Sequence, residues 1–173
     1  MATGDKTYRA SYGMSLTASE SIEVSGSIDH KNEVKLRGSG SLSATTAPPV
    51  SGVWGDDITI GGGGTGTLDL SALTGATIAT GAAMPDADFT GKKLQIIAIE
   101  CPVTNTAAVS FDVGAAQGYE FMGSATDFVT IGPGCSFMMS FNDNLADISA
   151  SLKSIDVTST DIDAWFNITL VAG

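Results

Sequence analysis

Short segments in which apolar and polar residues alternate, each closed by turn-forming residues, fill the second part of this 173-residue chain. Val109, Phe111 and Val113, for example, alternate with Ser110 and Asp112. A period of two residues is typical of a strand that buries one face. About eight such strands, spaced by roughly ten residues, predict an all-β fold, which we expect to be a jelly-roll-like β-sandwich.

Turn residues such as Gly114 and Pro133 set the bounds of the expected strands. The run from Leu94 to Ile99 is apolar at nearly every position, which predicts a strand covered on both faces or at the centre of its sheet. Asn144–Leu152 fits either a short helix or a turn followed by a strand. The expected strands are Thr67–Leu70, Thr77–Ala79, Lys93–Cys101, Ala108–Val113, Tyr119–Met122, Phe128–Ile131, Ser136–Phe141, Ser149–Ile155 and Ala164–Val171.

The first part of the chain alternates too, with apolar residues at even positions from Tyr8 to Leu16. We expect residues 1–37 to form a β-rich arm or a small meander, too thin to be stable unless it packs on the body or on a neighbour. Residues 38–65 are rich in Gly, Ser and Pro, which predicts a flexible connector. Residues 66–173 are then the sandwich body.

The formal net charge of −11 is unevenly distributed. Residues 1–37 hold five bases and five acids, whereas residues 38–173 hold three lysines against fourteen acids. A nucleic-acid-binding protein needs a basic surface, and an anionic membrane attracts one, so we expect neither nucleic acid nor membrane as a partner. The chain also lacks an apolar run of about 18 residues, so no membrane span is expected.

Residue types that carry catalysis are present but poorly arranged. His30 is the single histidine and lies beside Asp29 in a polar, turn-like stretch, whereas a Ser-His-Asp mechanism needs a histidine oriented in a shaped site. Acid pairs such as Asp56-Asp57, Asp86/Asp88 and Asp161/Asp163 fall in expected loops, without the aromatic platforms of a glycosidase. We therefore expect no enzyme, no catalytic residue and no cofactor.

Two loops carry weaker signals. Asn142-Asp143-Asn144 with Asp147 supplies oxygen ligands of the kind calcium prefers, but it departs from the EF-hand pattern. We expect no metal site, with a bound calcium ion at this loop as the open alternative. The run Gly61–Gly64 lacks the lysine of a phosphate-binding loop and predicts a hinge.

Cys101 and Cys135 show neither metal-ligand nor redox spacing. We expect both to be reduced and largely buried, with a single disulfide as the alternative. The first residues lack the apolar core of a signal peptide, so synthesis in the cytoplasm without export is expected.

Four segments, KLQIIAIECP, AAVSFDVGAAQGYEFMG, FVTIGPGCSFMMSF and DVTSTDIDAWFNITLVAG, carry a family resemblance. In texture and order, residues 93–171 resemble the jelly-roll domains of tailed-phage virion proteins, above all head decoration or cement proteins. The resemblance implies a structural protein on the exterior of the virion capsid, made in the host cytoplasm. It implies the major capsid protein and further copies of the chain, often as a homotrimer, as partners.

A carbohydrate- or receptor-binding β-sandwich module, for example of a phage tail fibre, is the alternative, since such modules have similar sequences. A sugar site needs exposed Trp or Tyr side chains, and the candidates in or near the body are Trp54, Tyr119 and Trp165. Burial of Trp165 in the last strand would argue against this alternative.

Self-association is expected to use large apolar side chains that neighbour each other in a strand, because adjacent residues point to opposite faces. Trp54 is expected either to fold back on its own core or to anchor the connector to a neighbour. The candidate interface residues are Tyr8, Tyr12, Trp54, Phe121, Met122, Met138 and Met139.

Overall fold

A computed structural model of the chain describes residues 9–24, 27–43, 45, 49–60, 64–74, 86–122, 124, 126, 128–141 and 145–173. Within these ranges every regular element is a strand, so the all-β class predicted from the sequence is confirmed. The strands are β1 (Arg9–Val24), β2 (Ser27–Ser43), β3 (Gly52–Thr59), β4 (Thr65–Asp69), β5 (Leu94–Glu100), β6 (Val109–Val113), β7 (Phe128–Ile131), β8 (Ser136–Ser140), β9 (Ser154–Ser159) and β10 (Trp165–Ala172).

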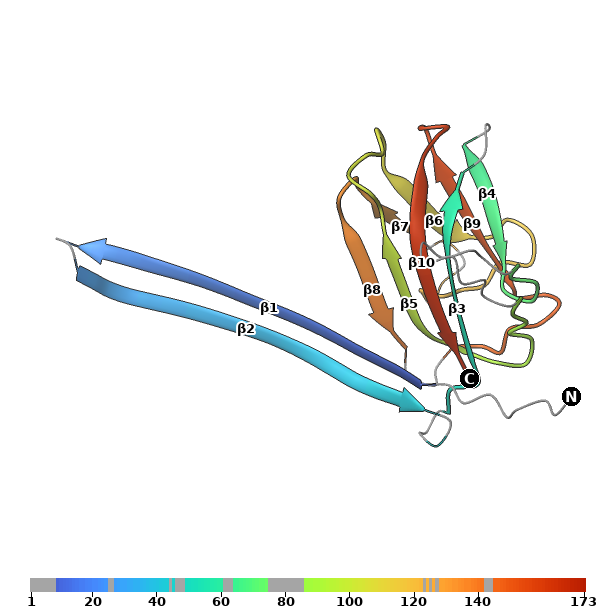
Figure 1. Cartoon of the computed structure of the whole chain (residues 1–173), viewed down its shortest axis with the longest axis horizontal. Helices are drawn as coiled ribbons and strands as arrows, with labels where there is room; N and C mark the ends of the chain where they lie inside the picture. The colour runs from blue at the N-terminus through green and yellow to red at the C-terminus, as the bar shows by residue number, and fades with distance from the viewer. Residues whose placement is uncertain are drawn as a thin grey trace, which may run out of the picture.

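Eight of these strands form the β-sandwich that the alternating segments predict (Figure 1). One sheet has the order β3-β10-β5-β8 and the other the order β4-β9-β6-β7, and all their pairs are antiparallel. The pairing is nested, because β3 pairs with β10, β4 with β9, β5 with β8 and β6 with β7. The first strand of the sandwich therefore lies beside the last, and both are fixed by long-range contacts.

The core lies between the two sheets. In β10 the residues Phe166, Ile168 and Leu170 are fully buried, whereas the alternate residues Trp165 and Asn167 are exposed. Phe166 meets Phe111 of the opposite sheet edge to face, with ring centroids 4.9 Å apart. Such an aromatic pair stabilises the packing of the sheets beyond the area that it buries, by about 1 kcal/mol.

Strand β5 is covered on both faces and lies inside its sheet, as its apolar run predicts. Leu94 and Ile97 both belong to the core between the sheets, although they are three positions apart and would lie on opposite faces of a regular strand. A register shift beside β10 accounts for this, because Val171 pairs with Ile96 and Ala172 with Leu94, which leaves one extra residue in β5. A bulge of this kind changes the parity of the faces. On the outer face, an outer cluster of Val50, Ile96 and Val171 packs with Leu42, Val53 and Met138.

The structure differs from the expected organisation in residues 38–65. Strand β2 continues to Ser43, and Gly52–Thr59 forms β3 at the edge of the first sheet instead of a flexible connector. Gly55 and the acid pair Asp56-Asp57 resemble a turn in the sequence, but pairing with β10 holds them in an extended strand. Trp54 is 2% exposed and its indole N–H donates to the carbonyl of Thr74, so it folds back on its own sandwich.

Other expected boundaries also move. Tyr119–Met122 is not a strand, and the strand expected at Ser149–Ile155 is found as β9, Ser154–Ser159. The helical alternative for Asn144–Leu152 is wrong over its described part, where Ser149 and Leu152 close a turn. The expected strand Thr77–Ala79 lies outside the described residues.

The N-terminal residues form one long hairpin instead of a meander. Strands β1 and β2 pair from Arg9 opposite Ser43 to Val24 opposite Ser27, so the turn expected near residues 29–32 lies within β2. At roughly 3.3 Å per residue, the 16 residues of β1 span about 50 Å. Figure 1 shows this hairpin extending to one side of the sandwich and joined to it at one end.

Candidate interaction surfaces

The hairpin has two faces of different composition, because alternate residues of a strand lie on opposite faces. One face is apolar or small, with Ala10, Tyr12, Met14, Leu16 and Ala18 opposite Leu42, Gly40, Gly38, Leu36 and Val34. The other face is polar, with Ser11, Gly13, Ser15, Thr17 and Ser19 opposite Ser41, Ser39, Arg37, Lys35 and Glu33. The period-two pattern of the sequence therefore becomes a ribbon with one apolar face.

The root of the hairpin is tied to the sandwich. Leu42 packs against the outer cluster, and Val50, which follows the hairpin, is 1% exposed within it. The carbonyl of Pro49 accepts a hydrogen bond from Nε2 of Gln95, a buried side chain at the register shift of β5. These contacts fix where the hairpin leaves the sandwich.

A second surface lies at the end of the sandwich opposite the hairpin root, and we call it the distal loop end. It consists of the loops that follow β5, β7 and β9, residues 101–108, 132–135 and 160–164. Among the described residues, two of the four large hydrophobic residues that are exposed lie here, with Val103 80% and Ile162 58% exposed, and a third, Trp165 at 37%, follows directly at the start of β10. The fourth, Phe128, is at the other end, where β7 begins.

The loops of the distal loop end hold one another in place. The backbone N–H of Gly134 donates to the carbonyl of Cys101, which joins the first loop to the second. The backbone N–H and hydroxyl of Thr106 both donate to Asp161, which joins the first loop to the third. These two hydrogen bonds, with a third from the N–H of Asp163, hold the pKa of Asp161 below its usual value. Asp161 therefore orders the loops as a carboxylate.

Trp165 lies where the distal loop end meets the outer face of the first sheet. Its register partner on β3 is Thr59. The next outward-facing residue, Asn167, lies between Asp57 of β3 and Glu100 of β5, and its Nδ2 donates to Asp57 at 2.6 Å. The outer face thus combines one exposed indole ring with a row of hydrogen-bonding side chains. Because Trp165 is exposed, the condition that would have argued against a carbohydrate-binding module is not met.

The candidate interface residues are not brought together. Trp54 and Phe121 are buried in the core of their own sandwich, which leaves neither side chain available to a partner. Met139 and Met122 are half-buried and pack against this core, whereas Met138 packs against the outer cluster. Adjacent residues therefore point to opposite faces in β8, as expected for Met138-Met139. The expectation fails for Phe121-Met122, because this pair lies in a turn. Tyr8 and the side chain of Tyr12 lie outside the described part of the structure.

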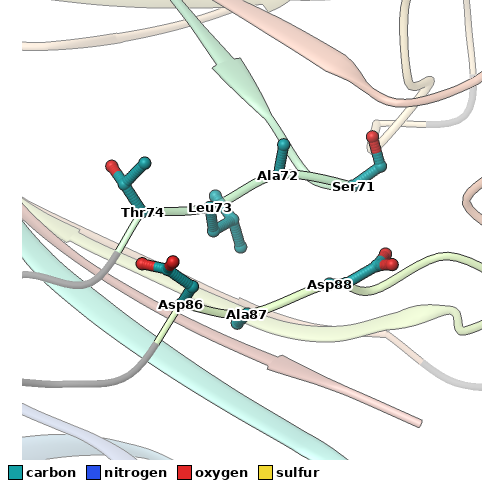
Figure 2. Close-up of a pocket in the computed structure, with 7 residues that line it drawn as sticks. All are labelled: Ser71, Ala72, Leu73, Thr74, Asp86, Ala87 and Asp88. Atoms are coloured by element: carbon teal, nitrogen blue, oxygen red, sulfur yellow. The ribbon is translucent and has the colours of Figure 1, made fainter.

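A hollow of about 250 Å³ lies beside the edge of the sandwich and is lined by Ser71, Ala72, Leu73, Thr74, Asp86, Ala87 and Asp88 (Figure 2). Leu73 and Ala87 bridge its two sides through backbone hydrogen bonds. The carboxylate of Asp88 accepts the backbone N–H of Thr90, and hydrogen bonds from Thr90 lower its pKa. The seven lining residues include no aromatic ring, and the hydroxyl of Ser71 donates to the carboxylate of Asp69.

The remaining candidates from the sequence are the histidine, the metal-binding and glycine-rich loops, and the two cysteines. His30 lies in β2 opposite Ile22, and no group of three potential metal ligands is found among the described residues. The calcium candidate Asn142-Asp143-Asn144 and most of the Gly61–Gly64 run lie outside the described ranges. Both cysteines are free thiols, but Cys135 is exposed, so the expectation of burial is wrong for this residue.

From the sequence, Trp165 is a sugar-site candidate, but the polar residues beside it are not predicted. Alternation along the last strand could have predicted these neighbours. Trp165, Asn167 and Thr169 occupy odd positions and therefore share one face, whereas the apolar residues Phe166 and Ile168 lie on the other. Asn105, which holds the Trp165 backbone, has no such local signal because its partner is 60 residues away.

The chain matches no protein-family model, no curated protein and no solved structure. No helix in the described part of the chain is long and apolar enough to cross a membrane. A function therefore has to be inferred from the hairpin, the sandwich and their surfaces.

Proposed function

We propose that this chain is a structural virion protein that binds the outside of an assembled phage capsid and stabilises it. The observation that carries the proposal is the β1–β2 hairpin, a long ribbon with one apolar face that extends from a compact sandwich (Figure 1). A protein with this role needs a rigid body and a means of holding several shell subunits, but no active site. In this proposal the major capsid protein is the partner of the hairpin.

The strand order of the sandwich supports the proposal. In a jelly roll, eight strands form two four-stranded sheets in which the first strand lies beside the last, the second beside the seventh, and so on inward. The pairs β3-β10, β4-β9, β5-β8 and β6-β7 follow this order. We propose that the body is a jelly roll, an architecture that capsid proteins and lectins share.

The physics of a two-stranded ribbon also supports it. An isolated hairpin is only marginally stable in water, so a ribbon of about 50 Å with apolar residues along one face gains stability when a partner covers that face. Both long edges of the ribbon also present backbone groups that can pair with another strand. Adding a strand to the edge of a partner's sheet is a common way of gaining affinity. A shell subunit that covers the apolar face or extends the edge would stabilise the ribbon.

The distribution of charge is consistent with a protein whose hairpin end faces the shell. The acids that exceed the bases all belong to residues 38–173, whereas residues 1–37 are neutral overall. Lys92, Lys93 and Lys153 lie at the end of the sandwich where the hairpin is attached, since they immediately precede β5 and β9 and Lys93 pairs with Gly173. The three bases of residues 38–173 therefore lie at the hairpin end, and the distal loop end, which holds none of them, would point away from the shell and its packaged nucleic acid.

Further copies of the chain are the second proposed partner. We propose a homotrimer on the shell, in which the edge strands β7 and β8 contact neighbouring copies. Light scattering at micromolar concentration tests this, since a trimer has three times the 17.6 kDa mass of the chain. A monomer mass in solution would leave the shell as the only organiser of the copies.

The capsid-binding proposal is tested by changing one face of the hairpin at a time. Leu16 and Leu36 are register partners on the apolar face, and the adjacent pair Thr17 and Lys35 lies on the polar face. The double variant Leu16→Ser with Leu36→Ser should reduce co-sedimentation with capsids that lack the protein at least tenfold. The matched variant Thr17→Ser with Lys35→Ser should bind within about threefold of the unchanged chain.

Two further results complete this test. Deleting residues 1–45 removes Leu42 but leaves Val50 in the outer cluster and the Pro49 carbonyl bonded to Gln95, so we expect the sandwich to stay folded while attachment is lost. Circular dichroism and a cooperative thermal transition check the fold of each variant. Capsid occupancy that is unchanged by the deletion, in a folded protein, would contradict the role given to the hairpin.

A further inference from the structure

We propose that the outer face of the β3-β10-β5-β8 sheet, around Trp165, binds neutral carbohydrate. This binding site goes beyond the capsid-attachment role and does not depend on it, because it lies at the end of the sandwich opposite the hairpin root. It would give an attached protein a sugar-binding surface directed away from the shell.

The first argument is that Trp165 is exposed and rigidly held. The residue is 37% exposed at the start of β10, while its backbone is paired with Thr59 and hydrogen-bonded to the side chain of Asn105. Because the backbone that carries the ring is already fixed, only the side-chain torsions of Trp165 have to be ordered when a ligand stacks on it. Sugar rings present a C–H face that packs on such a ring, since indole is a large apolar surface with a polar edge.

The second argument is the row of polar groups beside the ring. Asn167 lies two residues along β10 and is flanked in register by Asp57 and Glu100. Thr169 lies on the same face, and its register partner on β3 is Gly55, which has no side chain. Neighbouring strands are about 4.8 Å apart, which is close to the width of a pyranose ring. Carboxylate and amide groups at this spacing can accept and donate hydrogen bonds to the hydroxyls of a stacked sugar.

The third argument is charge, which selects the kind of carbohydrate. Asp57, Glu100, Asp161 and Asp163 lie on this face or in the adjoining loop, and the lysines of the sandwich are at its other end. At neutral pH these carboxylates repel sulfated, phosphorylated or uronic-acid-rich polymers. A neutral glycan, rich in hydroxyls and without charge, is the ligand that this surface complements.

A protein partner is the competing occupant, because Val103 and Ile162 are also exposed at the distal loop end. Those two side chains belong to loops beyond the sheet, whereas the residues next to Trp165 within the sheet are Thr59, Asn167 and Asp57. A protein interface would bury an apolar centre with a polar rim. Here a single ring lies beside a polar row, which favours a sugar.

Calorimetric titration of the full chain with neutral oligosaccharides tests the proposal. The probes are soluble oligomers of glucose, mannose, galactose and N-acetylglucosamine, with dextran sulfate as the anionic control. We expect at least one neutral oligomer to bind and dextran sulfate not to bind. Trp165→Ala should weaken binding at least tenfold and Asn167→Ala several-fold, whereas Val103→Ala should bind within about twofold of the unchanged chain.

Three outcomes would overturn the proposal. They are the absence of binding by every neutral oligomer, unchanged binding by Trp165→Ala, and equal binding of dextran sulfate. If Trp165→Ala abolishes self-association measured by light scattering while no sugar binds, the surface is a protein interface instead. Because the assay uses the free chain, these results leave capsid co-sedimentation, and hence the proposed function, to be judged separately.

Discussion

Asn105 takes the place of a neighbouring strand for Trp165. Its Nδ2 donates to the Trp165 carbonyl at 2.7 Å, and its Oδ1 accepts the Trp165 N–H at 3.2 Å. Strand β5, which pairs with β10 from Asn167 onward, has already ended at Glu100, so these two backbone groups face a loop instead of a strand. The side-chain amide, 7% exposed, supplies the donor and acceptor that a backbone peptide group would otherwise supply.

Replacing Asn105 by Ala should therefore destabilise the sandwich. The change leaves the N–H and carbonyl of Trp165 without their partner in a partly buried position, which costs about 1–3 kcal/mol. Urea unfolding followed by circular dichroism measures the loss. The control is Asn167→Ala on the exposed face of the same strand, for which a change within about 0.5 kcal/mol is expected. Equal unfolding midpoints for Asn105→Ala and the unchanged chain would show that the loop does not hold β10.

Gly64 should not tolerate a side chain, whereas Gly66 should. Gly64 has φ of 67°, and a Cβ there would lie closer to the carbonyl oxygen of Ser159 than van der Waals contact allows. The left-handed conformation and the clash together should cost Gly64→Ala more than about 2 kcal/mol. At Gly66 a Cβ meets nothing within 4 Å, so Gly66→Ala should be neutral or stabilising by up to about 1 kcal/mol. Thermal unfolding of the two variants, compared with the unchanged chain, checks the contrast.

Tyr119 should make stability depend on alkaline pH. Burial raises its pKa above the ordinary value of 10.0, and the nearby Asp147 adds to this, although the hydrogen bond from the N–H of Leu94 acts in the opposite direction. A group whose pKa is raised on folding contributes stability that is complete below its unfolded pKa and is lost as pH rises toward the folded pKa. We therefore expect the free energy of unfolding to fall above about pH 10.

The variant Tyr119→Phe separates this effect from general alkaline unfolding. Its hydroxyl donates to the carbonyl of Ala146 and accepts from Leu94, so removing it should cost about 1–2 kcal/mol at neutral pH. Absorbance near 295 nm should show one tyrosine of the three titrating later than the others, and this phase should be missing in the variant. A variant that keeps the late phase would assign it to Tyr8 or Tyr12.

Cys135 and Cys101 should differ in reactivity. Cys135 is exposed, whereas Cys101 is fully buried, and access to the thiol controls modification. A thiol reagent added to the folded protein should label one site quickly, and unfolding in urea should expose the second. Cys135→Ser should remove the fast reaction and leave the slow one. A mass 2 Da below that of the reduced chain would instead reveal a disulfide.

Local alternation of apolar and polar residues is enough to predict several strands of the sandwich. Strand β7 has the bounds that alternation predicts, β6 and β10 begin and end within one residue of them, and the apolar run of β5 indicates its cover on both faces. A strand that buries one face imposes a period of two on its own residues, so this information is present in a short segment. The acidic composition of residues 38–173 likewise needs no structure to be stated.

Which segments pair, and which aromatic residues remain exposed, depends on contacts between distant parts of the chain. Gly52–Thr59 resembles a connector, but its partner β10 lies more than a hundred residues later and turns it into an edge strand. Trp54 and Trp165 both occur in strands of one sheet, yet one ring faces the core at 2% exposure and the other faces outward at 37%. The face on which a residue lies depends on register and bulges set by distant strands, and a local pattern contains no information about a partner that is remote in the sequence.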